Sequence, residues 1–128
     1  MRSAADLLGP FDTPALRVRL LPVRTETVPV RPVPSWLRPL WPRWVGAMTF
    51  PWGIHVRGDV LAGPAEPLAR LLCHELVHFR QWRELGSLGF VVRYLADYVR
   101  GRLRGLSHRQ SYLAIGLEAE AYHLQDRL

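Results

Sequence analysis

The sequence contains a single cysteine, no lysine and no long run of apolar residues. Cys73 has no second cysteine with which to form an internal disulfide, so nothing in the sequence requires an oxidising compartment. Residues 1–6 lack the apolar run of a signal peptide. A membrane-spanning helix needs about 18 uninterrupted apolar residues, and no segment approaches that length. We therefore expect a soluble, cytoplasmic protein.

All 17 basic residues are arginine, and their excess over the acidic residues gives a formal net charge of +6. A charge of this size permits contact with nucleic acid or with an anionic membrane without requiring either. The chain has 128 residues, of which 48% are hydrophobic, which suits one domain with a substantial core and is too short for two. We expect a single domain over residues 1–128.

The first part of the chain, residues 1–45, predicts an extended lead-in and one strand. Residues 1–14 hold glycine and proline among scattered apolar residues, which is typical of a loosely attached segment. Apolar and charged residues alternate in 15–21, which predicts a half-buried strand. Prolines recur from Pro22 to Pro42, so this stretch cannot be a helix, is poor as a central strand, and should be extended.

Three tryptophans lie in this proline-rich stretch or just after it. Large aromatic rings most often anchor such a segment to a core. The alternative is a groove that takes an apolar or peptide ligand. The three residues are Trp36, Trp41 and Trp44.

Residues 46–128 predict a hairpin followed by three helices. Ala47–Phe50 and Gly53–Arg57 have the pattern of two short strands, joined across a Pro-Trp pair. Helices are expected over about residues 66–85 and 88–104, and a capping-box pattern of serine and glutamine starts a third at residue 108, running towards 128. Glycines mark the end of the first helix and a kink in the third: Gly86 and Gly116.

The first of these helices contains the sequence His-Glu-x-x-His at residues 74–78. One helical turn separates His74 from His78, so two imidazoles on one face can bind one metal ion. Glu75 lies about 100° further round the helix, where it can reach a metal-bound water without being a ligand. This is the arrangement of metal-assisted hydrolysis, in which Zn²⁺ acidifies a water molecule and a carboxylate takes its proton. The alternative is a pair of partly buried histidines that bind no metal.

A catalytic zinc site takes a third ligand from the protein and keeps one position open for water. Among the remaining histidines and acids, position in the third predicted helix favours Glu118 or Glu120, which lie beside apolar residues. Because these glutamates are two residues apart, they point about 200° away from each other, and only one is expected to bind the metal. Gln81, one turn beyond His78, is a candidate for a supporting hydrogen bond.

With these motifs the chain resembles a small gluzincin, the zinc-peptidase clan in which a glutamate from a later helix joins the two motif histidines. It is similar in layout to minimal gluzincins and to uncharacterised His-Glu-x-x-His families whose later helix reads Glu-x-x-Ala followed by Asp, Asn or Tyr. Here that second motif corresponds to residues 118–122. The resemblance covers the chain from about Gly53 onward and implies that Glu118 is the third ligand, with Glu120 as the fallback. It also implies one Zn²⁺ per chain and Glu75 as general base.

The resemblance further implies a fold and a substrate class. The expected fold is a minimal zincin-like α+β domain, in which a small antiparallel sheet or hairpin packs on three helices. The substrate is a peptide or protein. An edge strand beside the active helix commonly holds it in zinc peptidases, and residues 54–57 are our candidate. The alternative is that these residues form an ordinary edge strand. Larger gluzincins also use a histidine or tyrosine to stabilise the oxyanion. The candidates here are Tyr94, His108, Tyr112 and Tyr122.

A second hypothesis comes from the arginines of the last two predicted helices. They could form a basic module that binds nucleic acid or an acidic protein, with a metal site that is structural or vestigial. The residues are Arg93, Arg100, Arg102, Arg104 and Arg109. We favour the zinc metallopeptidase, and keep nucleic-acid binding as the alternative.

Overall fold

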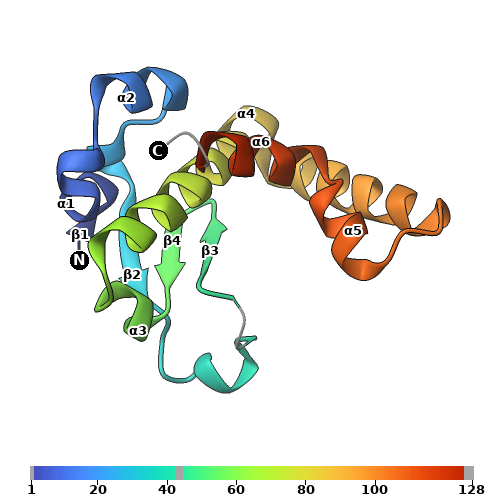
Figure 1. Ribbon diagram of the computed structural model, residues 1–128, viewed down its shortest axis with the longest axis horizontal. Coiled ribbons are helices and arrows are strands. Elements are labelled where there is room, and N and C mark those ends of the chain that lie inside the picture. Colours follow the sequence, from blue (N-terminus) through green and yellow to red (C-terminus); the bar gives the residue numbers. More distant parts are fainter. Residues whose placement is uncertain (1, 43–44, 126–128) are drawn as a thin grey trace.

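The computed structural model describes residues 2–42 and 45–125, and this part of the chain has an α+β fold with a four-stranded sheet (Figure 1). The strands β2 and β4 are parallel, whereas β1 pairs with β2 and β3 pairs with β4 in antiparallel fashion. The sheet is therefore mixed, and our expectation of an antiparallel sheet is wrong in this respect. The strands, in the spatial order β1-β2-β4-β3, are β1 (Arg2–Ser3), β2 (Pro29–Pro32), β4 (Gly53–Val56) and β3 (Ala47–Phe50).

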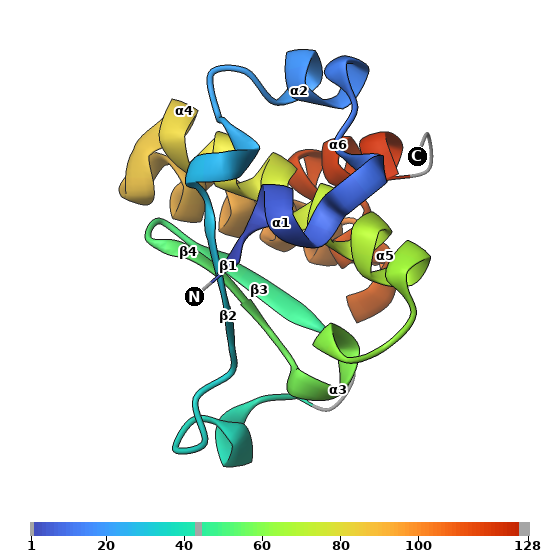
Figure 2. The same ribbon diagram turned by 90° about the vertical axis from the view of Figure 1, so that its left-hand side faces the viewer.

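Six helices lie in the described part of the chain: α1 (Ala4–Leu8), α2 (Pro14–Leu20), α3 (Gly58–Leu61), α4 (Ala65–Leu103), α5 (His108–Leu113) and α6 (Gly116–Gln125). Short 3-10 turns occur at Gly9–Phe11, Thr25–Thr27 and Arg38–Leu40. Figures 1 and 2 show α4 crossing one side of the sheet and continuing beyond it, with α5 and α6 packed along it. Over the residues described, none of these helices combines the length and the apolar character needed to span a bilayer.

Residues 14–20 form the helix α2, and the strand that we predicted over residues 15–21 is wrong. Thr13 caps α2 by accepting a hydrogen bond from the amide of Leu16, and Pro14 occupies the first turn, where its missing N–H is not needed. Leu16 and Leu20, one turn apart, are buried, and the residues between them are exposed. Over so short a segment, the apolar spacing fits both the two-residue period of a strand and the period of about 3.6 residues of a helix. The N-terminal cap favours the helix.

The N-terminal residues belong to the core, which contradicts the loosely attached lead-in that we expected. Ser3 and Asp6 form a capping box at the start of α1, and Ala4 and Leu8 on its inner side are 0% and 1% exposed. The helix packs against α4, while Arg2 and Ser3 pair with β2. The scattered apolar residues of this segment are therefore one face of a short helix.

The proline-rich stretch supplies an interior strand, although its prolines argued against one. Pro29 and Pro32 stand at the two ends of β2, and Val30 between them pairs with Arg2 on one side and Ile54 on the other. The missing proline N–H groups therefore lie at the ends of the strand and not in its middle.

The tryptophans of this stretch have different environments. Trp41 is an anchor, as predicted: it is 9% exposed, and its Nε1 donates a hydrogen bond to the carbonyl of Val45 at 2.8 Å. Trp36 is 75% exposed, so our expectation that it anchors the segment is wrong. Trp44 lies outside the described residues.

The predicted hairpin is confirmed as β3 and β4, with Pro51 and Trp52 at the turn. Our choice of residues 54–57 as a substrate-holding edge strand is wrong, because β4 lies between β2 and β3 and pairs with both. The edge of the sheet beside β4 is formed by β3, which packs against α4.

The first two predicted helices are confirmed as the two halves of α4, which meet at a kink. Gly86 has φ +72° and ψ 168°, a conformation that essentially only glycine adopts. Residues 65–85 pack on the sheet, whereas residues 87–103 extend beyond it (Figure 1).

The third predicted helix is in fact two helices. Ser107 and Gln110 form the expected capping box, and α5 begins at His108. After a break at residues 114–115, α6 starts at Gly116, whose N–H donates a hydrogen bond to Oδ2 of Asp97 on α4 at 3.1 Å. The interruption expected at Gly116 thus separates two helices and fixes the start of α6 against α4.

Leu72 of α4 lies in the main core, with 0% exposure, beside buried residues of α1, the sheet and α6. We expect Leu72→Ala to lower the free energy of unfolding by about 2–5 kcal/mol, because it removes buried apolar atoms and leaves a cavity. Urea unfolding followed by circular dichroism measures this change. Leu40→Ala, at a position 78% exposed, is the matched control and should shift the same free energy by less than about 0.5 kcal/mol. Equal effects of the two substitutions would contradict this placement of the core.

Candidate metal centre

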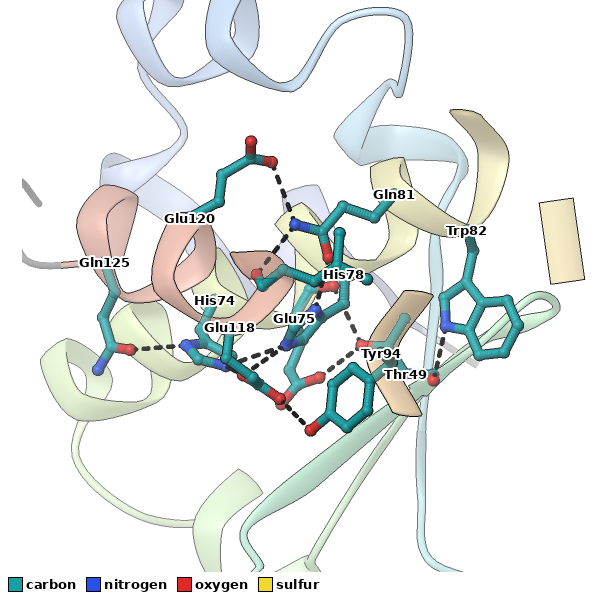
Figure 3. A network of polar contacts seen from close by, with 11 residues as sticks. Thr49, His74, Glu75, His78, Gln81, Trp82, Tyr94, Glu118, Glu120 and Gln125 are labelled. Atoms are coloured by element: carbon teal, nitrogen blue, oxygen red, sulfur yellow. Dashed lines mark hydrogen bonds and ion pairs between the residues drawn. The ribbon is translucent and has the colours of Figure 1, made fainter. Parts of the chain in front are cut away.

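His74 and His78 lie one turn apart on the half of α4 that crosses the sheet, and both face α6 (Figure 3). They are 5% and 6% exposed. Their neighbours along the helix, Leu72, Cys73, Leu76 and Val77, are fully buried in the core. Packing of α4 against the sheet and α6 therefore removes both imidazoles from water.

Glu118, in the first turn of α6, meets the two histidines. Its Oε1 lies 2.9 Å from Nε2 of His74 and 2.9 Å from Nε2 of His78, and the two Nε2 atoms are 3.2 Å apart. Ligand atoms bound to a tetrahedral zinc at about 2.0–2.1 Å are separated by about 3.3 Å, which is close to these distances. The three buried side chains can therefore hold one metal ion.

Gln81 fixes which nitrogen of His78 faces this centre. The Nε2 of Gln81 donates hydrogen bonds to the carbonyl of Leu117 at 3.0 Å and to Oε1 of Glu120 at 3.1 Å. Its Oε1 must then be the atom that faces Nδ1 of His78 at 2.9 Å, so Nδ1 carries the proton. The Nε2 of a neutral His78 consequently presents a lone pair to Glu118 and His74, as a metal ligand requires.

His74 is held by two residues of α6. Its Nδ1 donates a hydrogen bond to Oε1 of Gln125 at 3.0 Å, which leaves Nε2 of the neutral ring free to bind a metal. The ring of Tyr122 packs edge-on against the His74 ring, with centroids 4.5 Å apart. The orientation of His74 therefore depends on the same helix that carries Glu118.

Tyr94, from the half of α4 beyond the kink, holds the second oxygen of Glu118. Its hydroxyl donates a hydrogen bond to Oε2 at 2.6 Å. Burial alone would raise the pKa of Glu118, but its contacts with His74, with a protonated His78 and with the Tyr94 hydroxyl outweigh it and hold that pKa well below its usual value. Burial alone would lower the pKa of His78, but Glu118 and Glu75 raise it above its usual value. Both shifts mean that a positive charge between these atoms stabilises the cluster.

Glu75 is 5% exposed and does not belong to the cluster of three donors. Its Oε2 accepts a hydrogen bond from the hydroxyl of Thr49, on β3, at 2.5 Å. Burial raises the pKa of Glu75, and the effects of His78 and of the Thr49 hydroxyl offset only part of the rise. A carboxylate with a raised pKa accepts a proton more readily than an exposed one.

Glu120 is placed away from the histidines. Its Oε1 pairs with the guanidinium of Arg80 and accepts the hydrogen bond from Gln81. The structure thus brings Glu118 to both histidines and uses Glu120 to support Gln81, which in turn orients His78 (Figure 3).

Two cavities border the candidate centre, with volumes of about 470 and 270 Å³. His74, Glu75 and Tyr112 line both of them. His78 and Glu118 line the smaller one, and Arg109 lines the larger. The donor atoms and the Glu75 carboxylate are therefore next to space that a substrate can enter.

The four tyrosine and histidine candidates for oxyanion stabilisation each line at least one of the two cavities. Tyr94 and Tyr122 contact Glu118 and His74 directly, and His108 is hydrogen-bonded through Nδ1 to the hydroxyl of Tyr98 at 2.6 Å. Tyr112 lines both cavities. The basic residues of the alternative hypothesis, Arg93, Arg100, Arg102, Arg104 and Arg109, are all exposed.

Sequence reasoning missed the roles of Thr49 and Gln125. Thr49 reaches Glu75 only because β3 packs on α4, and Gln125 reaches His74 only because α6 lies along that helix, so no local pattern indicates either contact. Gln81 was found because it lies one turn from His78 in the same helix.

No protein-family model, curated protein or solved structure matches this chain. The features of the chain that bear on its function are therefore the donor atoms, cavities and charges around His74, His78 and Glu118.

Proposed function

We propose that the protein is a zinc-dependent metallopeptidase of the gluzincin type. In this proposal His74, His78 and Glu118 hold one Zn²⁺, and Glu75 is the general base. One observation supports it above all. The Nε2 atoms of both histidines lie next to Oε1 of Glu118, beside the buried carboxylate of Glu75 and at the wall of two cavities.

The donor set fits zinc. Imidazole nitrogen and carboxylate oxygen are common zinc ligands, and two histidines with one glutamate leave a fourth position for water or substrate. The hydrogen bonds from Nδ1 of His74 and His78 to glutamine oxygens direct both Nε2 lone pairs to one point, as supporting residues of metal sites do. When bound, zinc would polarise a carbonyl and make a water molecule more acidic.

Glu75 would perform the proton transfers. Its buried carboxylate lines both cavities, and its raised pKa suits a group that takes a proton from water and then gives it to a leaving amine. The hydroxyl of Thr49 holds one carboxylate oxygen and thereby limits the rotation of the side chain. The hydrogen bond from Tyr94 plays the same part for Glu118.

The strand β3 is suited to hold an extended peptide. The N–H of Arg57 donates a hydrogen bond to the carbonyl of Gly46. Backbone groups alternate in direction along an antiparallel strand, so the N–H and C=O of Met48 also point to β4. Those of Ala47 and Thr49 point away from β4. The Thr49 carbonyl on this side accepts a hydrogen bond from Nε1 of Trp82. Ala47 and Thr49 also line the smaller cavity, where a substrate could pair with β3 as an additional strand.

We assign oxyanion stabilisation to the Tyr112 hydroxyl, because this residue lines both cavities.

Metal analysis and a peptide-library digest test the proposal together. We expect about one zinc per chain and cleavage of fluorescent peptides that stops with 1,10-phenanthroline and resumes on addition of Zn²⁺. Protein prepared without chelator and free of transition metal would contradict the metal site. Cleavage that survives the chelator would contradict a zinc mechanism. Nucleic-acid binding with a steep salt dependence, in place of cleavage, would support the basic-module hypothesis.

A further inference from the structure

The half of α4 beyond Gly86 has two apolar faces. One face carries Phe90, Tyr94 and Tyr98, which belong to a second cluster of apolar residues with α5 and α6. The other face carries six aliphatic residues that are between 41% and 83% exposed. We call these six the outer stripe: Leu88, Val91, Val92, Leu95, Val99 and Leu103.

The outer stripe is continuous along the helix. Its members recur at spacings of three and four residues, so they lie on one side of α4 over four turns. A continuous apolar surface of this kind exceeds the scattered exposed leucines of ordinary protein surfaces and indicates a site of contact. Figure 1 shows this half of α4 projecting from the sheet, and the side chains of the outer stripe are exposed.

The charge around the outer stripe is positive. Residues 87–104 include four arginines and one acid, Asp97. That acid is already engaged, since its Oδ1 bonds Arg100 and its Oδ2 accepts from the N–H of Gly116. The exposed arginines of this half are Arg93, Arg100, Arg102 and Arg104.

This combination distinguishes between partners. A second copy of the chain, docked stripe to stripe, would bring two sets of arginines together, and like charges at close range oppose association. An anionic lipid surface complements both features, because an interfacial helix places its apolar side among acyl chains and its arginines among headgroups. We propose that residues 87–103 bind the surface of an anionic bilayer, with the outer stripe inserted at the interface.

The same helix half would bring the candidate metal centre close to the lipid. Tyr94 contacts Glu118, whereas the next residue, Leu95, belongs to the outer stripe. The centre would therefore lie on the order of one helix diameter, ~10 Å, from the bilayer. Binding to lipid does not depend on hydrolysis, so either proposal can fail without the other.

Co-sedimentation of the full chain with lipid vesicles tests this inference. Vesicles of phosphatidylcholine mixed with phosphatidylglycerol are compared with vesicles of phosphatidylcholine alone, at low and high salt. We expect binding to the mixed vesicles to be at least ~10-fold tighter, and to weaken as salt screens the arginines. We also expect the double substitution Leu95→Ser and Val99→Ser to weaken binding to the mixed vesicles at least ~10-fold, because it removes apolar contact.

The matched control replaces two aliphatic residues outside α4 that are more exposed than Leu95 and Val99: Val18→Ser and Leu40→Ser, at positions 67% and 78% exposed. This variant should bind the mixed vesicles like the unaltered protein, and thermal unfolding should show both variants folded. Equal binding by all three proteins would overturn the inserted stripe, as would failure of the unaltered protein to bind. Light scattering that shows a dimer which the stripe substitutions dissociate would assign the stripe to a second copy instead.

Discussion

Replacing Glu75 with glutamine should leave the zinc content at about one per chain and lower the rate of peptide hydrolysis by about 10²–10⁴-fold, the usual contribution of a general base. Glutamine keeps the shape of the side chain and can still accept the hydrogen bond from Thr49, but its amide cannot take a proton from water. Metal analysis and peptide cleavage, measured on the same preparation, check the two parts of this prediction.

The stability of the metal-free variant gives a control for Glu75→Gln. The pKa of Glu75 is higher in the folded protein than its usual value, so its ionisation opposes folding as the pH rises above that usual value. A neutral side chain removes this penalty, and the thermal midpoint of the metal-free variant at pH 7 should be no lower than that of the unaltered protein. Full hydrolytic activity in a zinc-loaded Glu75→Gln protein would remove Glu75 from the proposed role.

Replacing Glu118 with alanine should weaken zinc binding by about 10²-fold or more. The substitution removes one of three protein ligands and also the negative charge that Glu118 would bring to the metal. Competition with a zinc-sensitive dye measures the dissociation constant directly. At a given zinc concentration, zinc should also raise the thermal midpoint of the unaltered protein by more than that of the variant, because the stabilisation falls as the affinity of the folded state falls.

Glu120→Ala is the matched control, since it makes the same change two residues away on the same helix. Glu120 touches Arg80 and Gln81 and not the histidines, so we expect one zinc per chain and a far smaller loss of affinity. Greater loss of zinc from Glu120→Ala than from Glu118→Ala would reverse the assignment of the third ligand.

Secondary structure was predicted best from the sequence where a residue pattern is local and extends over many residues. The helices around the His-Glu-x-x-His motif follow from apolar periodicity and glycine positions, and the capping box at Ser107 follows from spacing alone. The strand predicted over residues 15–21 is wrong because the segment is too short for its apolar period to distinguish a strand from a helix. The interior position of β2 was not predicted, because prolines make a segment a poor central strand. Only the pairing register shows that these prolines lie at the ends of the strand.

The candidate site divides in the same way. His74, Glu75, His78 and Gln81 could be related to one another because they share one helix, whose geometry is known in advance. The spacing of Glu118 and Glu120 shows that they point apart, but which one faces α4 depends on how α6 docks. Two tertiary contacts that no sequence motif indicates contribute to that docking: Gly116 at the start of α6 with Asp97 of α4, and Gln125 at its end with His74.

Gly86 is needed for its backbone conformation and not for its small size. Apart from its chain neighbours and the adjacent helix backbone, no atom of the described residues lies within 4 Å of the point where its Cβ would be, so a methyl group there would meet no other part of the structure. The difficulty is the backbone, because φ +72° with ψ 168° is strained for an L-residue, while its mirror image lies in the comfortable extended region. A D-alanine at this position would fit where an L-alanine would not. The angle between the half of α4 that carries the histidines and the half that carries Tyr94 thus depends on one achiral residue, whose backbone adopts a conformation that L-residues avoid.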